Sequence, residues 1–212
     1  MEWKAVLFLG AYHGINPGMG WLFAVALGMQ QGSSRGVWRA LPPIAVGHMA
    51  SVGTVLLVAG LAQTVVPLPI MKLIVASLLV AFGLFRLWRG RHPRFGGMQV
   101  GFRDLTVWSF LMASAHGAGL MVLPFVMNMS DHVLASGGGH VHHGPIAEAP
   151  AFPWTGAMAL ALHTLAYLLV LAFAAWIVYW KLGLALLRTA WFNLDLIWSG
   201  ALVVTGLFIL WF

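Results

Sequence analysis

The segment His13-Gly14-Ile15-Asn16-Pro17-Gly18-Met19-Gly20 is the most informative part of the sequence for the fold, because it interrupts an apolar run that extends from position 4 to position 30. Pro17 lacks a backbone donor and its ring clashes with the preceding helical turn, while the glycines leave peptide groups uncovered. Hydrocarbon offers these groups no hydrogen-bond partner, so such a break is stable in a membrane only where it faces protein or a water-filled cavity. The stretch therefore predicts a broken membrane helix of the kind that marks substrate sites in transporters. The alternative is a proline kink that lets two helices pack closely.

The composition is that of a polytopic membrane protein. Of the 212 residues, 61% are apolar and only 8% are charged, whereas a soluble domain carries about 25% charged residues. The net charge of +6 does not indicate nucleic-acid binding, because the basic residues lie in short connections between apolar runs. The absence of cysteine excludes disulfides, thiolate metal ligands and dithiol redox chemistry. The first run carries Glu2 and Lys4 without a small-residue cleavage site, so we expect a spanning helix rather than a removable signal peptide.

Apolar runs long enough to cross a hydrocarbon core, which takes about 20 residues, occur six times. The sequence therefore predicts an all-α, polytopic membrane protein with six transmembrane helices in a single transmembrane domain over residues 1–212. The expected helices cover residues 4–30, 40–62, 69–89, 105–128, 155–180 and 186–212. We expect the second helix to open with Pro42 and Pro43 in its first turn, where proline is tolerated.

The basic residues predict the orientation of the chain. The connections after the first, third and fifth helices hold nine Lys and Arg residues, and the other side of the membrane holds only Lys4 and Lys72. Because positive residues collect on the cytoplasmic side, we expect a multi-pass protein of the cell (inner) membrane with the linker 91–104 in the cytoplasm. Both termini and the loop 130–153 would then lie outside.

Two apolar runs match each other closely. Residues 73–88 and 196–211 share nine identities in 16 positions, including Gly-Leu-Phe and the closing Trp. His-Gly pairs recur in the first and fourth runs, and a histidine recurs near the start of the second and fifth. The pattern indicates a 3+3 repeat, with copies over residues 1–90 and 105–212. Because three is odd, the copies would be inverted relative to each other, and this places a shared site at the midplane between them.

One histidine lies in the middle of each of the first, second, fourth and fifth expected helices. These residues are His13, His48, His116 and His163. Each lies roughly 12–16 Å from the end of its helix at about 1.5 Å per residue, where an ionisable group is expensive unless paired and is a functional candidate. The alternative is an interhelical hydrogen bond. Neutral imidazole ligates transition-metal ions such as Ni, Co, Zn or Cu, and near a pKa of about 6.5 it carries protons. The four histidines are therefore candidate metal ligands, and Asn16, Pro17 and Gly18 complete a candidate ion or substrate pathway.

Three further residues carry weaker predictions. Met19 and Met49 would add thioether ligands that suit copper, although a Met in an apolar helix more often serves packing. Asp195 is the only acid within an apolar run. Deep in the last helix, it would belong to the pathway as a counter-charge or proton carrier; nearer the cytoplasmic surface, it would pair with Arg188. The sequence leaves both positions open.

The expected outer loop 130–153 has a distinct composition, because it contains no Lys or Arg and holds a cluster of histidines after three glycines. His140, His142 and His143 form this cluster, which is typical of flexible metal-collecting tracts. They are weak candidate metal ligands, and the alternative is a polar loop whose histidines bind nothing.

The pattern Gly-x-x-His-Gly-x-Asn-Pro-Gly-x-Gly-Trp over residues 10–21 and the segment Ala-Leu-Pro-Pro-Ile-Ala-Val-Gly-His over residues 40–48 support a resemblance. With six spans and small size, the chain resembles the lysine-exporter (LysE) superfamily. That superfamily includes amino-acid and anion exporters, cadmium and nickel–cobalt transporters, and thiol-electron carriers related to the membrane domain of DsbD. The chain departs from the thiol carriers because it has no cysteine, and from the nickel–cobalt branch because no expected helix holds a His-x-x-x-x-Asp-His element. The resemblance implies a transporter with an inverted repeat and does not select a branch.

No paired catalytic carboxylates, nucleophile triad or phosphate-binding loop is visible, so we expect no enzyme. The first hypothesis is a transporter that moves a transition-metal ion through the histidine-lined site by alternating access. The second is a proton-coupled exporter of a small anion or amino acid, bound by the half-helix ends near Asn16 and Gly18. The third is a membrane subunit of a larger assembly, or an accessory in metal delivery. The expected partners are the lipid bilayer, a small ion or molecule, and a second copy or membrane complex.

Overall fold

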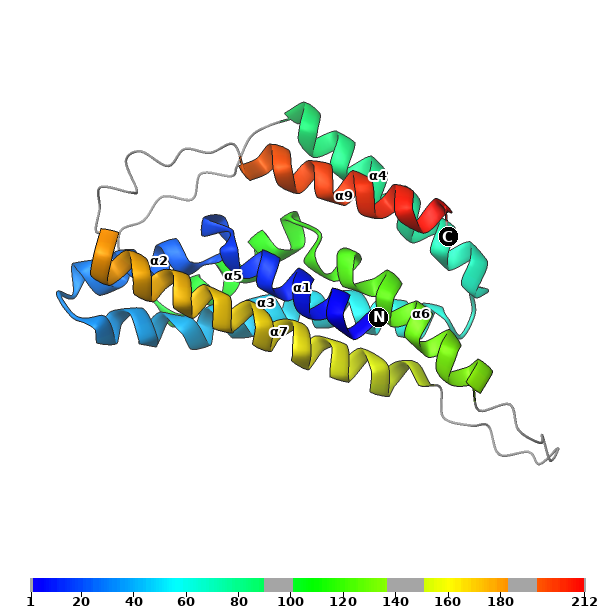
Figure 1. Ribbon diagram of the computed structural model, residues 1–212, viewed down its shortest axis with the longest axis horizontal. Helices are drawn as coiled ribbons and strands as arrows, with labels where there is room; N and C mark the ends of the chain where they lie inside the picture. The colour runs from blue at the N-terminus through cyan, green and yellow to red at the C-terminus, as the bar shows by residue number, and fades with distance from the viewer. Residues whose placement is uncertain (1, 90–100, 137–150, 183–193, 212) are drawn as a thin grey trace.

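The structure is a computed structural model that describes residues 2–89, 101–136, 151–182 and 194–211, with side-chain surroundings for residues 2–67, 69–85, 87–88, 101–129, 154–181 and 199–211. Within these ranges the regular structure is entirely helical, as the sequence predicts (Figure 1). The helices are α1 (Glu2–Ile15), the 3₁₀ turn η1 (Pro17–Met19), α2 (Trp21–Gln30), α3 (Ser34–Ala62), α4 (Leu68–Arg89), α5 (Phe102–Ala115), α6 (Ala118–Ser136), α7 (Ala151–Ile177), the π-helical turn η2 (Val178–Leu182) and α9 (Leu194–Trp211).

Two helical segments, Ser34–Ala62 and Trp154–Lys181, are long and apolar enough to cross a membrane, and the bent pair α5–α6 is a third candidate. The other described apolar helices are shorter, so the six-span arrangement stays a prediction. Large apolar side chains point outward along the candidate spans, among them Leu57 on α3 and Phe173 on α7. An apolar exterior of this kind suits hydrocarbon better than water.

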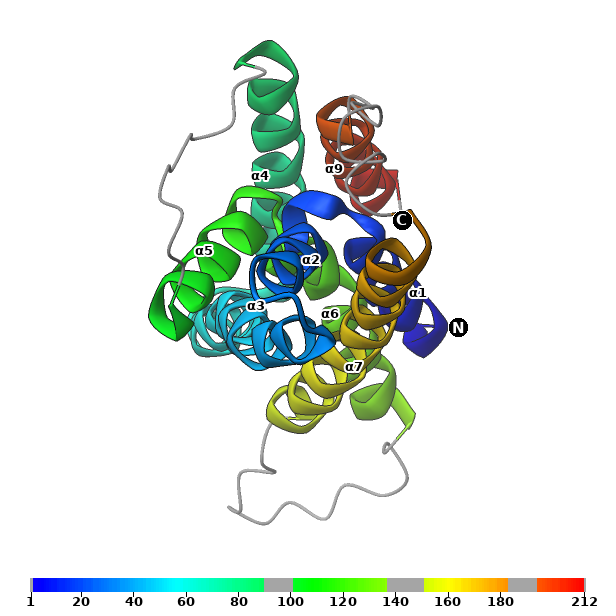
Figure 2. The ribbon, with the colours of Figure 1, turned by 90° about the vertical axis from the view of Figure 1, so that its left-hand side faces the viewer.

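The helices associate in pairs that are distant in sequence. α1 lies along α7, α5 lies along α3, and α4 lies along α9. α4 and α9 lie together on one side of the bundle formed by the other helices and contact it mainly through α6 (Figures 1 and 2). The α2–α3 turn and the α3–α4 turn lie at opposite ends of the elongated molecule, as expected for a helix that spans it (Figure 1).

The α4–α9 pair is closely packed through two glycines. A Cβ atom added at Gly83 would lie 3.0 Å from the carbonyl oxygen of Ser199, and one added at Gly206 would lie 2.9 Å from that of Ala76. Small residues allow such close backbone contact between apolar helices. Gly83 packs against the segment of α9 that precedes Gly206, and Gly206 packs against the segment of α4 that precedes Gly83. The contact is therefore reciprocal, and the two helices are antiparallel.

The second expected helix begins earlier than predicted. α3 starts at Ser34, where the Ser33 hydroxyl accepts a hydrogen bond from the Arg35 amide (3.2 Å) and caps the helix. The prediction that Pro42 and Pro43 occupy a first turn is therefore wrong, because both lie inside α3. The cap defines the start of the helix, and the prolines only remove two of its internal backbone donors.

The fourth expected helix is not continuous. α5 and α6 meet at a bend of 62°, where Gly117 has a φ of +67° in the left-handed region that favours glycine. The prediction of one helix over residues 105–128 is therefore wrong. The expected loop 130–153 is also shorter than predicted, because α6 continues to Ser136 and α7 begins at Ala151.

Candidate functional site

Three of the four predicted histidines form one buried cluster. His13 comes from α1, His48 from α3 and His163 from α7, and all three side chains are fully buried. The ring centroids lie 5.8 Å apart for His13 and His48, 5.2 Å for His13 and His163, and 5.3 Å for His48 and His163. The pairing of α1 with α7 and the contact of α7 with α3 therefore bring together imidazoles that are up to 150 positions apart in the chain.

Backbone carbonyls fix the orientation of two of these rings. His13 Nδ1 lies 2.7 Å from the oxygen of Leu9, and His163 Nδ1 lies 3.3 Å from that of Val6. A carbonyl oxygen only accepts hydrogen bonds, so each Nδ1 carries the proton and each neutral ring has its lone pair on Nε2. Metal-binding histidines are usually held by this arrangement, in which the second nitrogen donates to a carbonyl or carboxylate.

His48 has a different environment. Neither of its ring nitrogens, nor His163 Nε2, has a hydrogen-bond partner among the residues whose side chains the structure describes. A buried polar atom left unpaired costs about 1–3 kcal/mol. His48 is held instead by the ring of Tyr167, which stacks on it with a centroid distance of 3.9 Å and an interplanar angle of 13°.

The fourth histidine belongs to the second break. His116 is buried at the junction of α5 and α6, and its Nδ1 lies 2.7 Å from the carbonyl oxygen of Met112. His13 makes the same contact with the residue four positions earlier. The two His-Gly pairs noted in the sequence thus share this Nδ1 contact, although Gly14 lies within α1 and Gly117 has a left-handed backbone. The three-ring cluster itself comes from α1, α3 and α7.

The first break lies where the sequence predicts it, and protein groups surround it. The Asn16 side-chain oxygen accepts from the Gly18 amide (2.9 Å), with Pro17 at the first position of η1. The Trp21 indole donates to the carbonyl of Ile15 (2.9 Å), and the Tyr167 hydroxyl donates to that of Met19 (2.5 Å). These donors replace the partners that the broken helix loses, as a membrane interior requires.

Tyr167 is the functional candidate that the sequence analysis missed. It is fully buried, stacks on His48 and donates to the broken turn, so it contacts both parts of the candidate site. It follows His163 by one turn of α7, and this spacing on a helix face was the available signal.

The other predicted residues contribute less. Met19 is buried in η1, whereas Met49 is exposed and does not reach the buried cluster. Asp195 is the second residue of α9, but its side chain lies outside the described ones. His140, His142 and His143 lie outside the described residues.

Within the described part of the chain, no three histidine or acidic residues are arranged to hold a metal ion. The spacing of the rings is suitable, because a tetrahedral cation about 2.0–2.1 Å from each ring nitrogen would leave the centroids roughly 5 Å apart. The orientation of the rings is not suitable for a shared cation, since the planes of His48 and His163 are nearly parallel, at 12°. Binding would therefore require rotation of the rings, above all of His48, and little movement of the helices.

Comparison with known proteins gives no match: no family model, curated protein or solved structure is similar to the chain. The resemblance to the LysE superfamily therefore remains a prediction from the sequence.

Proposed function

We propose that this protein is a small integral-membrane transporter that moves a transition-metal cation through the cluster of His13, His48 and His163. The observation that carries the proposal is the burial of three imidazoles from three helices with ring spacings of 5.2–5.8 Å. His13 and His163 each donate Nδ1–H to a carbonyl, the arrangement that usually holds metal-binding histidines.

The chemistry of the cluster favours a borderline metal ion. Imidazole nitrogen suits Zn, Cu, Ni and Co, whereas Mg and Ca prefer oxygen ligands. Rotation of His48 toward the other two rings would let its ring nitrogen bind the cation. This bond would offset the cost of leaving that nitrogen unpaired in the empty site. The proposed substrate is therefore a divalent or copper-type cation that passes through the site as cargo.

The helix arrangement supports alternating access by six spans in a 3+3 inverted repeat of the LysE type. The first helix of each proposed half packs on the second helix of the other, α1 on α7 and α5 on α3, and the third helices α4 and α9 pack on each other. The reciprocal contact of Gly83 and Gly206 is what a two-fold axis between α4 and α9 would produce. Such repeats move around a fixed central site in secondary transporters. We place both termini on the outer side.

Metal binding and flux measurements test this proposal. The purified protein is titrated with Zn, Ni, Co and Cu ions by calorimetry, and metal flux is then followed in proteoliposomes. We expect saturable binding of at least one ion, and His48→Ala and His13→Ala should abolish flux while the helical circular-dichroism signal is unchanged. Met49→Ala, which removes an exposed side chain that does not reach the cluster, is the control and should keep full flux. Absence of binding for all four ions, or full flux in His48→Ala, would contradict the proposal.

A second candidate function, proton-coupled export of a small anion or amino acid, rests on one observation at the first break. Asn16 is buried, and its side-chain nitrogen has no acceptor among the described residues, so it can donate to an anion. Proton flux that depends on an added anion and persists after metal chelation would favour this function. In that case Asn16→Ala should reduce flux more than His48→Ala does.

A further inference from the structure

An apolar groove separates α4 from the helices beneath it. It has a volume of about 310 Å³ and is lined by residues of α3, α4 and α6. Its floor is buried and includes Ala59, Met71 and Leu123, whereas Val58 and Leu78 at its edges are more than half exposed. The groove is therefore open to the surroundings of the protein along its length and closed beneath.

The dimensions of the groove suit a hydrocarbon chain. From Met71 to Leu78 along α4 it extends for about 10 Å at about 1.5 Å per residue, which is most of the roughly 15 Å available to an acyl chain in one half of the bilayer core. The hydroxyl of Thr54 in the groove wall donates to the Ala50 carbonyl (2.7 Å) and needs no ligand. An apolar cavity about half this size already binds a small hydrocarbon.

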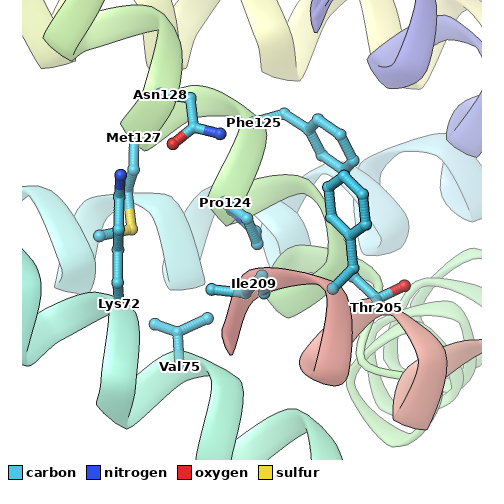
Figure 3. A pocket seen from close by; sticks show the side chains of 9 residues that line it. Lys72, Val75, Pro124, Phe125, Met127, Asn128, Thr205 and Ile209 are labelled. Carbon is cyan, nitrogen blue, oxygen red and sulfur yellow. The ribbon is translucent and has the colours of Figure 1, made fainter. Parts of the chain in front are cut away.

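A second, small pocket adjoins the groove at Val75, which lines both; its lining is mostly apolar and includes the polar side chains of Lys72, Asn128 and Thr205. This pocket, between α4, α6 and α9, has a volume of about 30 Å³, enough for one water molecule or one phosphate oxygen. Figure 3 shows that the Lys72 ammonium group and the Asn128 amide lie at the same end of it. Lys72 is in the second turn of α4, close to the α3–α4 turn, at the depth where a lysine reaches lipid headgroups.

We propose that the groove binds one acyl chain of an anionic phospholipid whose phosphate lies against Lys72 and Asn128. Any lipid would fill an open apolar groove, but the adjacent cation selects a negatively charged headgroup. Lys72 and Lys4 are the two basic residues on the expected outer side, and of the two only Lys72 lines this pocket. A basic residue near a membrane surface strengthens binding of anionic lipid by about fivefold. The lipid would join α4 to the bundle, which α4 otherwise contacts mainly through α6.

Native mass spectrometry of the detergent-purified protein, with phosphatidylglycerol or phosphatidylcholine of equal chain length, tests the proposal. We expect one tightly held phosphatidylglycerol, bound several-fold more tightly than phosphatidylcholine. Lys72→Gln should reduce this preference about fivefold, whereas the matched control Lys4→Gln should leave it unchanged. Equal binding of the two lipids by the unmodified protein, or no effect of Lys72→Gln, would overturn the assignment of the headgroup.

A second pair of variants tests the groove itself. Ala62→Phe places a ring in the groove and should reduce retention of both lipids, whereas Leu61→Phe changes an exposed neighbour that does not line it. Val58→Trp at the exposed edge is an alternative that leaves the packed floor intact and should have the same effect as Ala62→Phe. Full retention of phosphatidylglycerol by folded Ala62→Phe and Val58→Trp would show that the lipid binds elsewhere.

Discussion

The α1–α2 break and the α5–α6 break each follow a buried histidine whose Nδ1 donates to the carbonyl four residues earlier. At the first break the chain makes the 3₁₀ turn η1, and Trp21 and Tyr167 donate to the carbonyls that are freed. At the second break only His116 and Gly117 separate the two helices, and Gly117 changes the chain direction with a φ of +67°. The chain is therefore interrupted with the support of side-chain donors in one case and by a backbone conformation in the other.

The two breaks should therefore respond differently to substitution. Hydrogen bonds at the first break can be removed one at a time, and each loss should be moderate. The second break depends on one residue type, because any side chain at Gly117 meets both backbone strain and its neighbours.

The largest effect is expected at the second break. Gly117→Ala forces an alanine into the left-handed region, which costs about 1–2 kcal/mol, and places its Cβ 2.8 Å from Leu202 Cδ2. Overpacking adds about 1–3 kcal/mol, so we expect a total loss of about 2–5 kcal/mol in the free energy of unfolding. Denaturant titration in detergent measures this loss. Gly32→Ala is the control, because Gly32 has a φ of +57° but no neighbour within 4 Å. Equal losses in the two variants would show that packing against Leu202 plays no part.

A smaller effect is expected at the first break. Tyr167→Phe keeps the ring that stacks on His48 but removes the donor to the Met19 carbonyl. We expect a loss of about 1–3 kcal/mol, the penalty for leaving a buried group unsatisfied, in the same titration. Tyr179→Phe removes a hydroxyl from a half-buried side chain in η2 and serves as the control. A Tyr167→Phe protein as stable as the unmodified one would mean that the broken turn is held by its own backbone.

The smallest effect tests whether the second break also uses side chains. The Ser114 hydroxyl, two residues before His116, lies 2.8 Å from that of Ser51 on α3. Ser114→Ala should reduce stability by about 0.5–1.5 kcal/mol, and thermal unfolding followed by tryptophan fluorescence can resolve the change. Thr106→Ala, which removes only a bond to the carbonyl of Phe102 in the same helix, is the comparison. A loss from Ser114→Ala larger than that from Gly117→Ala would reverse the contrast between the breaks.

The sequence predicts the first break because proline and glycine in one apolar run leave backbone groups that require partners. It does not predict the second, because His116-Gly117 contains no proline and the turn depends on tertiary packing near Leu202. A depth estimate along each helix places His13, His48, His116 and His163 at one level. It cannot say which rings face one another, since that depends on the rotation of each helix.

Tyr167 illustrates the same limit. Its spacing from His163 indicates only that the two residues share one face of a helix, and its role arises only when α7 packs on both α1 and α3. The start of α3 was missed for a local reason, because Pro42 and Pro43 are a stronger sign of a boundary than the cap at Ser33.

The antiparallel contact of α4 with α9 has a consequence for synthesis. About a hundred residues separate the end of α4 from the start of α9, and a ribosome takes about 5–20 s to add them. During this interval the glycine face of α4 has not yet met α9, so another component can contact it until the last helix emerges. A nascent chain that ends before Leu194 should therefore crosslink through position 83 to the insertion machinery or to lipid, and that crosslink should disappear once α9 is complete.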